Sequence, residues 1–129
     1  MGFGKYKILV VDDEENSRVC LGKLLDQAGY DVTCVSGGHE ALAFLAKNAV
    51  NFVLSDIRMP DMDGLSLLNE IHELYPQTFV VMVTAYGEVD TYLEAVNLGA
   101  CDFVHKPVRF NELKLVLEKL SITQALQYS

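Results

Sequence analysis

The chain of 129 residues is half apolar and 22% charged, a balance typical of one folded domain rather than of a disordered or fibrous chain. Its longest unbroken apolar stretch, Ala41 to Ala46, is far too short to cross a bilayer, so a membrane span is not expected. The net charge of −8 opposes contact with a phosphate backbone, which argues against a domain that binds nucleic acid directly.

Five short runs rich in β-branched and other apolar residues predict five strands, each separated from the next by a longer segment. In chain order the runs are Lys7–Val11, Asp31–Val35, Phe52–Ser55, Phe79–Thr84 and Ala100–Val104. Four of them are apolar almost throughout, which is typical of strands that are covered on both faces.

Apolar residues recur at helical spacing after every predicted strand. The stripes, in chain order, are Leu21, Leu24, Leu25 and Ala28; Leu42 and Leu45; Leu65, Leu68, Ile71 and Leu74; Val89, Leu93 and Val96; and Leu113, Val116, Leu117 and Leu120. Five strand–helix repeats predict an α/β domain with right-handed crossovers, a parallel sheet and helices on both faces.

We expect residues 1–129 to form a single domain with its core between about 5 and 120. The end of the chain, residues 121–129, keeps helical spacing through Ile122, Ala125 and Leu126. This segment either extends the last helix or begins a linker.

The cysteines and the start of the chain predict a cytoplasmic protein. Cys20, Cys34 and Cys101 are odd in number and lack a CxxC spacing, which suits a reducing compartment. They are expected to be small buried residues rather than ligands or nucleophiles. Nothing at the start of the chain has the pattern of a secretory signal.

Polar residues lie at the carboxyl ends of four of the predicted strands. Asp12 and Asp13 end the first strand, and Asp56 ends the third. Thr84 ends the fourth strand, and Lys106 follows the fifth. Ligands of such sheets bind beyond the carboxyl ends of the strands, so we expect these side chains to converge at one edge.

Three carboxylates in one place repel one another unless they are protonated or neutralised by a cation. A divalent ion such as Mg²⁺ takes oxygen ligands and suits one or two carboxylates together with a phosphate. An aspartate also acts as a nucleophile that forms an aspartyl phosphate, and an ammonium and a hydroxyl bind phosphoryl oxygens. The pattern predicts a site that accepts a phosphoryl group. The neighbouring acidic residues are expected only to be solvated; they are Glu14, Glu15, Asp61 and Asp63.

Four sequence blocks carry a resemblance to a known family. They are Ile8-Leu9-Val10-Val11-Asp12-Asp13-Glu14, Ser55-Asp56-Ile57-Arg58-Met59-Pro60, Val83-Thr84-Ala85 and Lys106-Pro107. In this order, each ending its own strand, they resemble the receiver domain of two-component response regulators over about residues 5–120. The resemblance implies a flavodoxin-like (βα)5 fold, doubly wound, with five parallel strands in the order 2-1-3-4-5 and five helices, two on one face and three on the other.

The resemblance also implies a role for each polar residue at the sheet edge. Asp56 is the implied phosphoacceptor, which takes its phosphoryl group from a phosphohistidine of a histidine kinase or phosphotransfer protein. Asp12, Asp13 and Asp56 are implied Mg²⁺ ligands, together with the backbone carbonyl of Arg58. Lys106 is expected to pair with Asp56 and, after modification, with its phosphoryl group.

A switch is implied as well. Thr84 is expected to bind the phosphoryl group and to draw the following loop inward, and Phe103 stands where the family carries its switch aromatic, often Tyr. The face formed by the helix Glu88–Leu98, the fifth strand and the helix after Arg109 is then expected to bind an output domain, a partner protein or a second copy of the chain.

A role or an orientation is also expected for three further residues beside the site. Arg58 and Tyr86 occupy positions that are expected to tune the lifetime of the acyl phosphate. His105 precedes Lys106 directly, so the alternation of side chains along a strand is expected to point it away from the site.

The implied function is a phosphorylation-activated signalling switch, with regulation of transcription as one output and no catalysis beyond its own phosphorylation and dephosphorylation. The alternative is a Mg²⁺-dependent phosphohydrolase with an aspartyl nucleophile. Such hydrolases carry Asp-x-Asp at the first strand, whereas this strand ends in Asp12-Asp13-Glu14, and the residues after Asp56 offer no acid in that place. The switch is therefore favoured.

Overall fold

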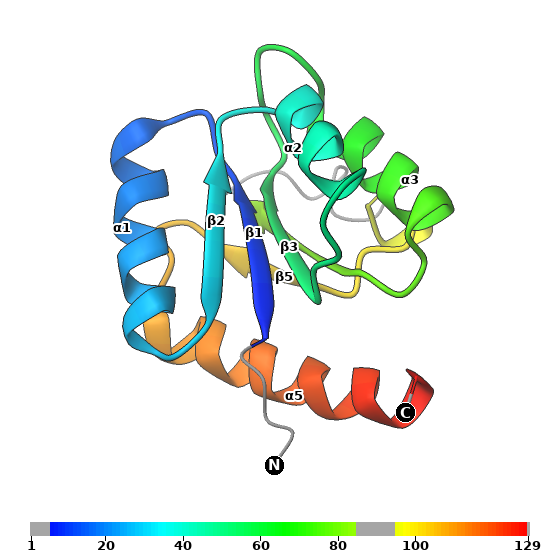
Figure 1. Cartoon of the computed structure of the whole chain (residues 1–129). Helices are drawn as coiled ribbons and strands as arrows, with labels where there is room; N and C mark the ends of the chain where they lie inside the picture. The colour runs from blue at the N-terminus through cyan, green and yellow to red at the C-terminus, as the bar shows by residue number, and fades with distance from the viewer. Residues whose placement is uncertain (1–5, 85–94, 129) are drawn as a thin grey trace.

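The computed structural model describes residues 6–84 and 95–128, which form a parallel sheet with helices on both sides (Figure 1). The strands are β1 (Lys7–Val11), β2 (Asp31–Val35), β3 (Phe52–Asp56), β4 (Phe79–Thr84) and β5 (Asp102–His105). Every neighbouring pair runs parallel, and the order is β2-β1-β3-β4-β5. The predicted flavodoxin-like strand order is confirmed.

The described helices are α1 (Glu15–Gln27), α2 (Gly38–Leu45), α3 (Gly64–Leu74) and α5 (Phe110–Tyr128). α1 and α5 cover one face of the sheet, and α2 and α3 cover the other (Figure 1). Residues 95–97 are also helical and fall within the helix predicted over Glu88–Leu98, most of which lies outside the described residues. Within the described parts of the chain, no helix has the length and apolar character needed to span a membrane.

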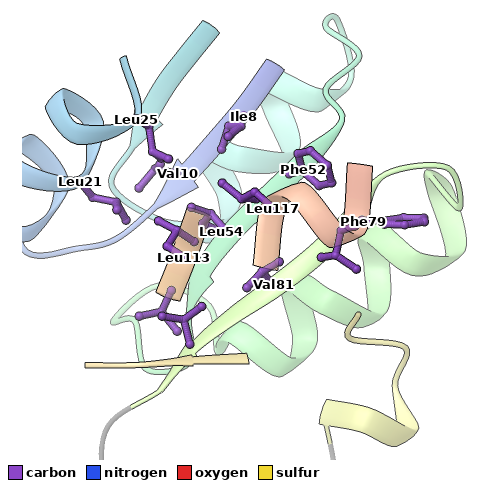
Figure 2. Close-up of a cluster of buried hydrophobic side chains, with 13 residues drawn as sticks. Ile8, Val10, Leu21, Leu25, Phe52, Leu54, Phe79, Val81, Leu113 and Leu117 are labelled. Carbon is purple, nitrogen blue, oxygen red and sulfur yellow. The ribbon is translucent and has the colours of Figure 1, made fainter. Parts of the chain in front are cut away.

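Alternate side chains of the strands enter two cores, one on each face of the sheet. Phe52, Leu54 and Leu117 are fully buried on the face covered by α1 and α5 (Figure 2). Leu67 and Met82 are fully buried on the face covered by α2 and α3. Each such side chain stabilises the fold by about 1.5–3 kcal/mol on leaving water. Burial on both faces is the reason that the strands are apolar almost throughout.

β5 begins two residues later than the apolar pattern predicts, at Asp102 instead of Ala100. The N–H of Ala100 still donates to the carbonyl of Ala95, at 3.0 Å, and so belongs to the end of the preceding helical turn. Gly99 reverses the chain there with a φ of 104°, a conformation that glycine adopts at little cost. β5 also extends one residue further than predicted, through His105.

The three cysteines are exposed, so the prediction that they are small buried residues is wrong. Cys34 lies on β2 and Cys101 directly precedes β5, and these two strands form the edges of the sheet. Cys20 lies on an exposed part of α1. Cys34 nevertheless contacts α1, because its Sγ lies 3.8 Å from the carbonyl oxygen of Arg18.

The last turns of α5 are fixed to the sheet through Gln124, whose side chain is buried. Its amide nitrogen donates to the main-chain carbonyls of Asn51 and Gln77, at 2.9 and 3.0 Å. The amide of Asn51 in turn donates to the Gln124 side-chain oxygen, and its own side-chain oxygen accepts from the N–H of Lys7. These contacts lie at the amino ends of β1, β3 and β4. The last turns of α5 are therefore held at the end of the sheet opposite to the predicted site, which lies at the carboxyl ends of the strands.

Replacing Gln124 with Ala is expected to lower the free energy of unfolding by about 1–3 kcal/mol, because partly buried polar groups of Asn51 and Gln77 lose their hydrogen-bond partner. Urea denaturation measures this loss. Gln127→Ala, at an exposed position on the same helix, is the matched control and should change stability little. Equal losses in the two variants would show that Gln124 does not anchor the helix.

Candidate functional site

Three aspartates meet where β1 and β3 end. Asp12 and Asp13 directly follow β1, and Asp56 is the last residue of β3, the strand paired with β1. One carboxylate oxygen from each residue lies within 4.8 Å of the other two. Asp12 is buried, Asp56 is half-buried and Asp13 is exposed, so the cluster opens to solvent on one side.

Lys106 brings an ammonium group to these carboxylates. It directly follows β5, and its Nζ lies 2.8 Å from Asp56 Oδ2 and 4.0 Å from Asp12 Oδ2. The side chain of Lys106 is 32% exposed and that of Asp56 is 14% exposed, so water screens the pair less than it screens a surface ion pair. The peptide bond between Lys106 and Pro107 is cis.

Main-chain donors fix the orientation of two of the carboxylates. Asp12 Oδ1 accepts from the N–H of Glu14 at 2.9 Å, and Asp56 Oδ1 accepts from the N–H of Ile57 at 3.1 Å. The Oδ2 atom of each of these two carboxylates is the one that lies near the Lys106 ammonium. Arg18 of α1 donates from Nη1 to the main-chain carbonyl of Asp12 at 2.8 Å, a contact that sequence reasoning missed. The sequence offers one signal for this contact: a basic residue lies one turn into the helix that follows the aspartates.

Burial and the surrounding charges together set the pKa values of the central pair. Burial raises the pKa of Asp56; Lys106 opposes this shift, and the charges of Asp12 and Asp13 add to it. Burial alone would lower the pKa of Lys106, but the hydrogen bond and charge of Asp56 and the charge of Asp12 outweigh it, so the pKa of Lys106 is raised. One ammonium does not neutralise three carboxylates, and the remaining charge favours a bound cation.

The donor set of the cluster fits a hard divalent cation. Carboxylate oxygens are the ligands that such ions prefer, and the three here are close enough to share one ion. The exposure of Asp13 leaves that side of the cluster open to the waters that Mg²⁺ retains. Arg58 lies two residues after Asp56 with an exposed side chain, and the part of its backbone carbonyl as a ligand stays a prediction. Tyr86, expected to tune the site, lies outside the described residues.

The two ends of the connection between β3 and α3 lie in close contact with each other. The N–H of Gly64, the first residue of α3, donates to the carbonyl of Ile57 at 2.7 Å. A Cβ at this position would overlap the main-chain oxygen of Asp56, so the residue must be glycine for α3 to approach this closely. The segment that follows Asp56 is therefore fixed by the start of α3.

The expectation that Asp61 and Asp63 are only solvated is wrong, because both carboxylates cap helices. Asp61 accepts from the N–H groups of Gly38 and His39 at the start of α2, at 3.2 and 3.0 Å. The bond from the His39 N–H contributes most to lowering the pKa of Asp61. Asp63 accepts from the N–H of Leu65 at the start of α3. Carboxylates are favoured at helix N-termini, where main-chain N–H groups have no partner within the helix.

Thr84 and His105 contact each other at the ends of β4 and β5, and the expectation that His105 points away from the carboxylate cluster stays a prediction. Thr84 ends β4, which pairs with the strand of Asp56, and its side chain is buried. Its Oγ1 lies 3.1 Å from His105 Nδ1. Phe103, two residues earlier on β5, is half-buried and packs against the core on the α2 and α3 face.

Comparisons with known proteins connect this arrangement to one family. A family model described as "Response regulator receiver domain" matches residues 8–118. Regulatory protein AtoC of Escherichia coli (strain K12) is 39% identical over 94% of this chain and 26% of its own length. Transcriptional regulatory protein ZraR of Salmonella typhimurium is 41% identical over 90% of this chain and 26% of its own. The chain thus spans about a quarter of the length of these curated relatives.

A solved structure extends the likeness to the whole fold. The signal receiver domain of an HD domain-containing protein from Pseudomonas fluorescens Pf-5 superimposes with a TM-score of 0.90 at 31% sequence identity. The match covers 95% of this chain and 98% of that one, so both chains consist almost entirely of the shared fold.

The raised pKa of Asp56 predicts a pH dependence of stability when no metal is bound. In the unfolded chain this carboxyl ionises at its ordinary pKa of about 3.9, whereas the folded protein holds the proton to higher pH. As the pH rises above about 4, the unfolded state loses the proton first, and folding is disfavoured increasingly until Asp56 has ionised in both states. The side chain of Asn has no acidic proton to lose. The free energy of unfolding of Asp56→Asn, compared with that of the wild type, should therefore rise with pH between the unfolded and the folded pKa of Asp56.

Thermal unfolding in EDTA at a series of pH values from about 4 to 7 measures this difference. Glu70→Gln, at an exposed carboxylate on α3, is the control and should follow the wild-type curve. If the melting temperature of Asp56→Asn, measured relative to that of the wild type, falls as the pH rises, the pKa of Asp56 is not raised.

Proposed function

The chain belongs to the family of response regulator receiver domains, and from this we propose that Asp56 is the residue that carries its phosphoryl signal. Receiver domains are the phosphorylation-activated switches of response regulators, and this chain is such a regulatory domain. One observation carries the assignment to Asp56. Its carboxylate lies 2.8 Å from the Lys106 ammonium and within 4.8 Å of the carboxylates of Asp12 and Asp13.

In the proposed reaction, a carboxylate oxygen of Asp56 attacks the phosphorus of a phosphohistidine on a histidine kinase or phosphotransfer protein. The new P–O bond forms as the P–N bond breaks, and the electron pair of the broken bond stays on the imidazole nitrogen of the donor. Mg²⁺ bound by Asp12, Asp13, Asp56 and the Arg58 carbonyl would supply the positive charge that stabilises the phosphoryl oxygens. The chain would catalyse at most this transfer and its own dephosphorylation.

Lys106 is proposed to change partner during the transfer. In the resting protein its ammonium pairs with Asp56 at 2.8 Å. Its raised pKa keeps it charged at neutral pH, so the same ammonium is available to a phosphoryl oxygen once Asp56 is modified. Arg58 and Tyr86 would then tune the lifetime of the acyl phosphate from beside the site.

The proposed readout starts at Thr84 and ends on the face formed by segment 88–98, β5 and α5. Movement of the Thr84 hydroxyl toward a phosphorylated Asp56 would let the half-buried Phe103 ring turn inward. This face would bind an output domain, a partner protein or a second copy of the chain. α5 supports such a role because it exposes the large apolar side chains of Leu115, Ile122 and Leu126.

The names of the relatives support regulation of transcription as the output. AtoC is named a regulatory protein and ZraR a transcriptional regulatory protein. For this chain we propose a location in the cytoplasm, which its unpaired cysteines suit. The net charge of −8 makes direct contact with nucleic acid unfavourable, so we do not assign DNA binding to this domain.

Incubation with acetyl phosphate and Mg²⁺ is expected to add one base-labile phosphoryl group per chain, because Asp56 accepts a single phosphoryl group. Asp56→Asn should abolish the label, and Asp13→Ala should raise the Mg²⁺ concentration needed for it by about tenfold or more. Glu70→Gln removes a carboxylate far from the cluster and should be labelled at the wild-type rate. Intact-mass spectrometry follows all four proteins.

Two outcomes would contradict the proposal. Full labelling of Asp56→Asn at the wild-type rate would show that another residue is the acceptor. Repeated release of phosphate from generic phosphomonoesters, in place of stoichiometric labelling, would indicate a phosphohydrolase instead of a switch.

A further inference from the structure

The contact between Thr84 and His105 gives the resting state of the proposed switch a specific structure. Thr84 is 3% exposed, and its Oγ1 lies 3.1 Å from His105 Nδ1. A buried hydroxyl needs an acceptor for its single proton, and within residues 6–84 and 95–128 the imidazole nitrogen is its observed partner. Nδ1 satisfies the hydroxyl when it accepts this proton, with the ring's own proton on Nε2.

The position of the two residues follows from the register of the sheet. Thr84 and His105 are paired directly across β4 and β5. The carbonyl of Thr84 also accepts from the N–H of Lys106 at 2.7 Å, which holds the end of β5 against β4. Met82 and Phe103 form the preceding pair on the same side of the two strands, so the hydroxyl, the imidazole and the Phe103 ring share one face.

The hydroxyl of Thr84 cannot serve both of its acceptors at once. Phosphoryl oxygens on Asp56 are acceptors, and the hydroxyl has one proton to donate. We propose that His105 is a positioning residue that holds the Thr84 hydroxyl in the resting state and must release it when Asp56 is phosphorylated. This inference rests on the proposed function, because it concerns the competition between His105 and that phosphoryl group.

His105 therefore sets how far phosphorylation shifts the equilibrium. Without an acceptor at position 105, the buried hydroxyl loses the partner that it has among residues 6–84 and 95–128 in the resting state, whereas the phosphorylated state is unaffected. The resting state then rises in free energy relative to the phosphorylated one. Loss of His105 should strengthen the response to a phosphoryl group instead of weakening it.

Fluoroberyllate with Mg²⁺ mimics a phosphoryl group and tests this role of His105. Its binding to the 129-residue chain is measured by the chemical shifts of the backbone amides. His105→Val removes the acceptor and should tighten binding about three- to tenfold. His105→Asn is the conservative variant, since its side-chain oxygen stands near the place of Nδ1, and it should stay within about twofold of the wild type. In a Thr84→Val background, His105→Val should change the affinity no further.

The ¹⁵N shifts of the His105 ring provide a readout that needs no phosphoryl group. The proton is expected on Nε2 in the resting chain, and the Nδ1 shift should change in Thr84→Val. Unchanged affinity in His105→Val, an equal gain in the Thr84→Val background, or a ring proton on Nδ1 would each overturn the inference. A wild-type chain that binds no fluoroberyllate would overturn the proposed function, whereas the ring shifts still report the resting contact by themselves.

Discussion

The ion pair between Lys106 and Asp56 is the interaction on which the site depends. Asp12 and Asp13 crowd the same edge of the sheet, and the 2.8 Å contact with an ammonium lets the resting protein hold Asp56 beside them. The neutralisation is incomplete, because burial and the neighbouring carboxylates still raise the pKa of Asp56. That remaining negative charge favours a divalent cation, and a phosphoryl group would give Lys106 a second anion to pair with.

Parallel pairing of the strands is what brings these groups together from distant parts of the sequence. β1, β3, β4 and β5 pair in succession, so the residues at their carboxyl ends share one edge. Both cores pack against this sheet, and Gln124 anchors α5 at the opposite edge. Under the proposed function, a chemical change at Asp56 would act on this packed frame through side chains that exchange partners, such as Thr84 and Lys106.

The fold and the acidic cluster could be predicted because they follow from local patterns. Apolar strands in alternation with helices fix the class, and carboxylates directly after strands must lie at one edge. Contacts between segments far apart were out of reach: no local signal shows that Asp61 caps α2 or that Gln124 bonds to the carbonyls of Asn51 and Gln77. The contact between Thr84 and His105 was also out of reach, because it depends on the register of β4 and β5.

Borohydride trapping tests most directly whether the carboxylate paired with Lys106 is the one that is phosphorylated. Borohydride reduces an acyl phosphate to an alcohol, so a phosphorylated aspartate becomes homoserine, which peptide mass spectrometry locates in the chain. The account predicts homoserine at position 56 alone, formed only when Mg²⁺ is present during phosphorylation. Homoserine at position 12 or 13, or phosphorylation at a site that borohydride does not reduce, would contradict it.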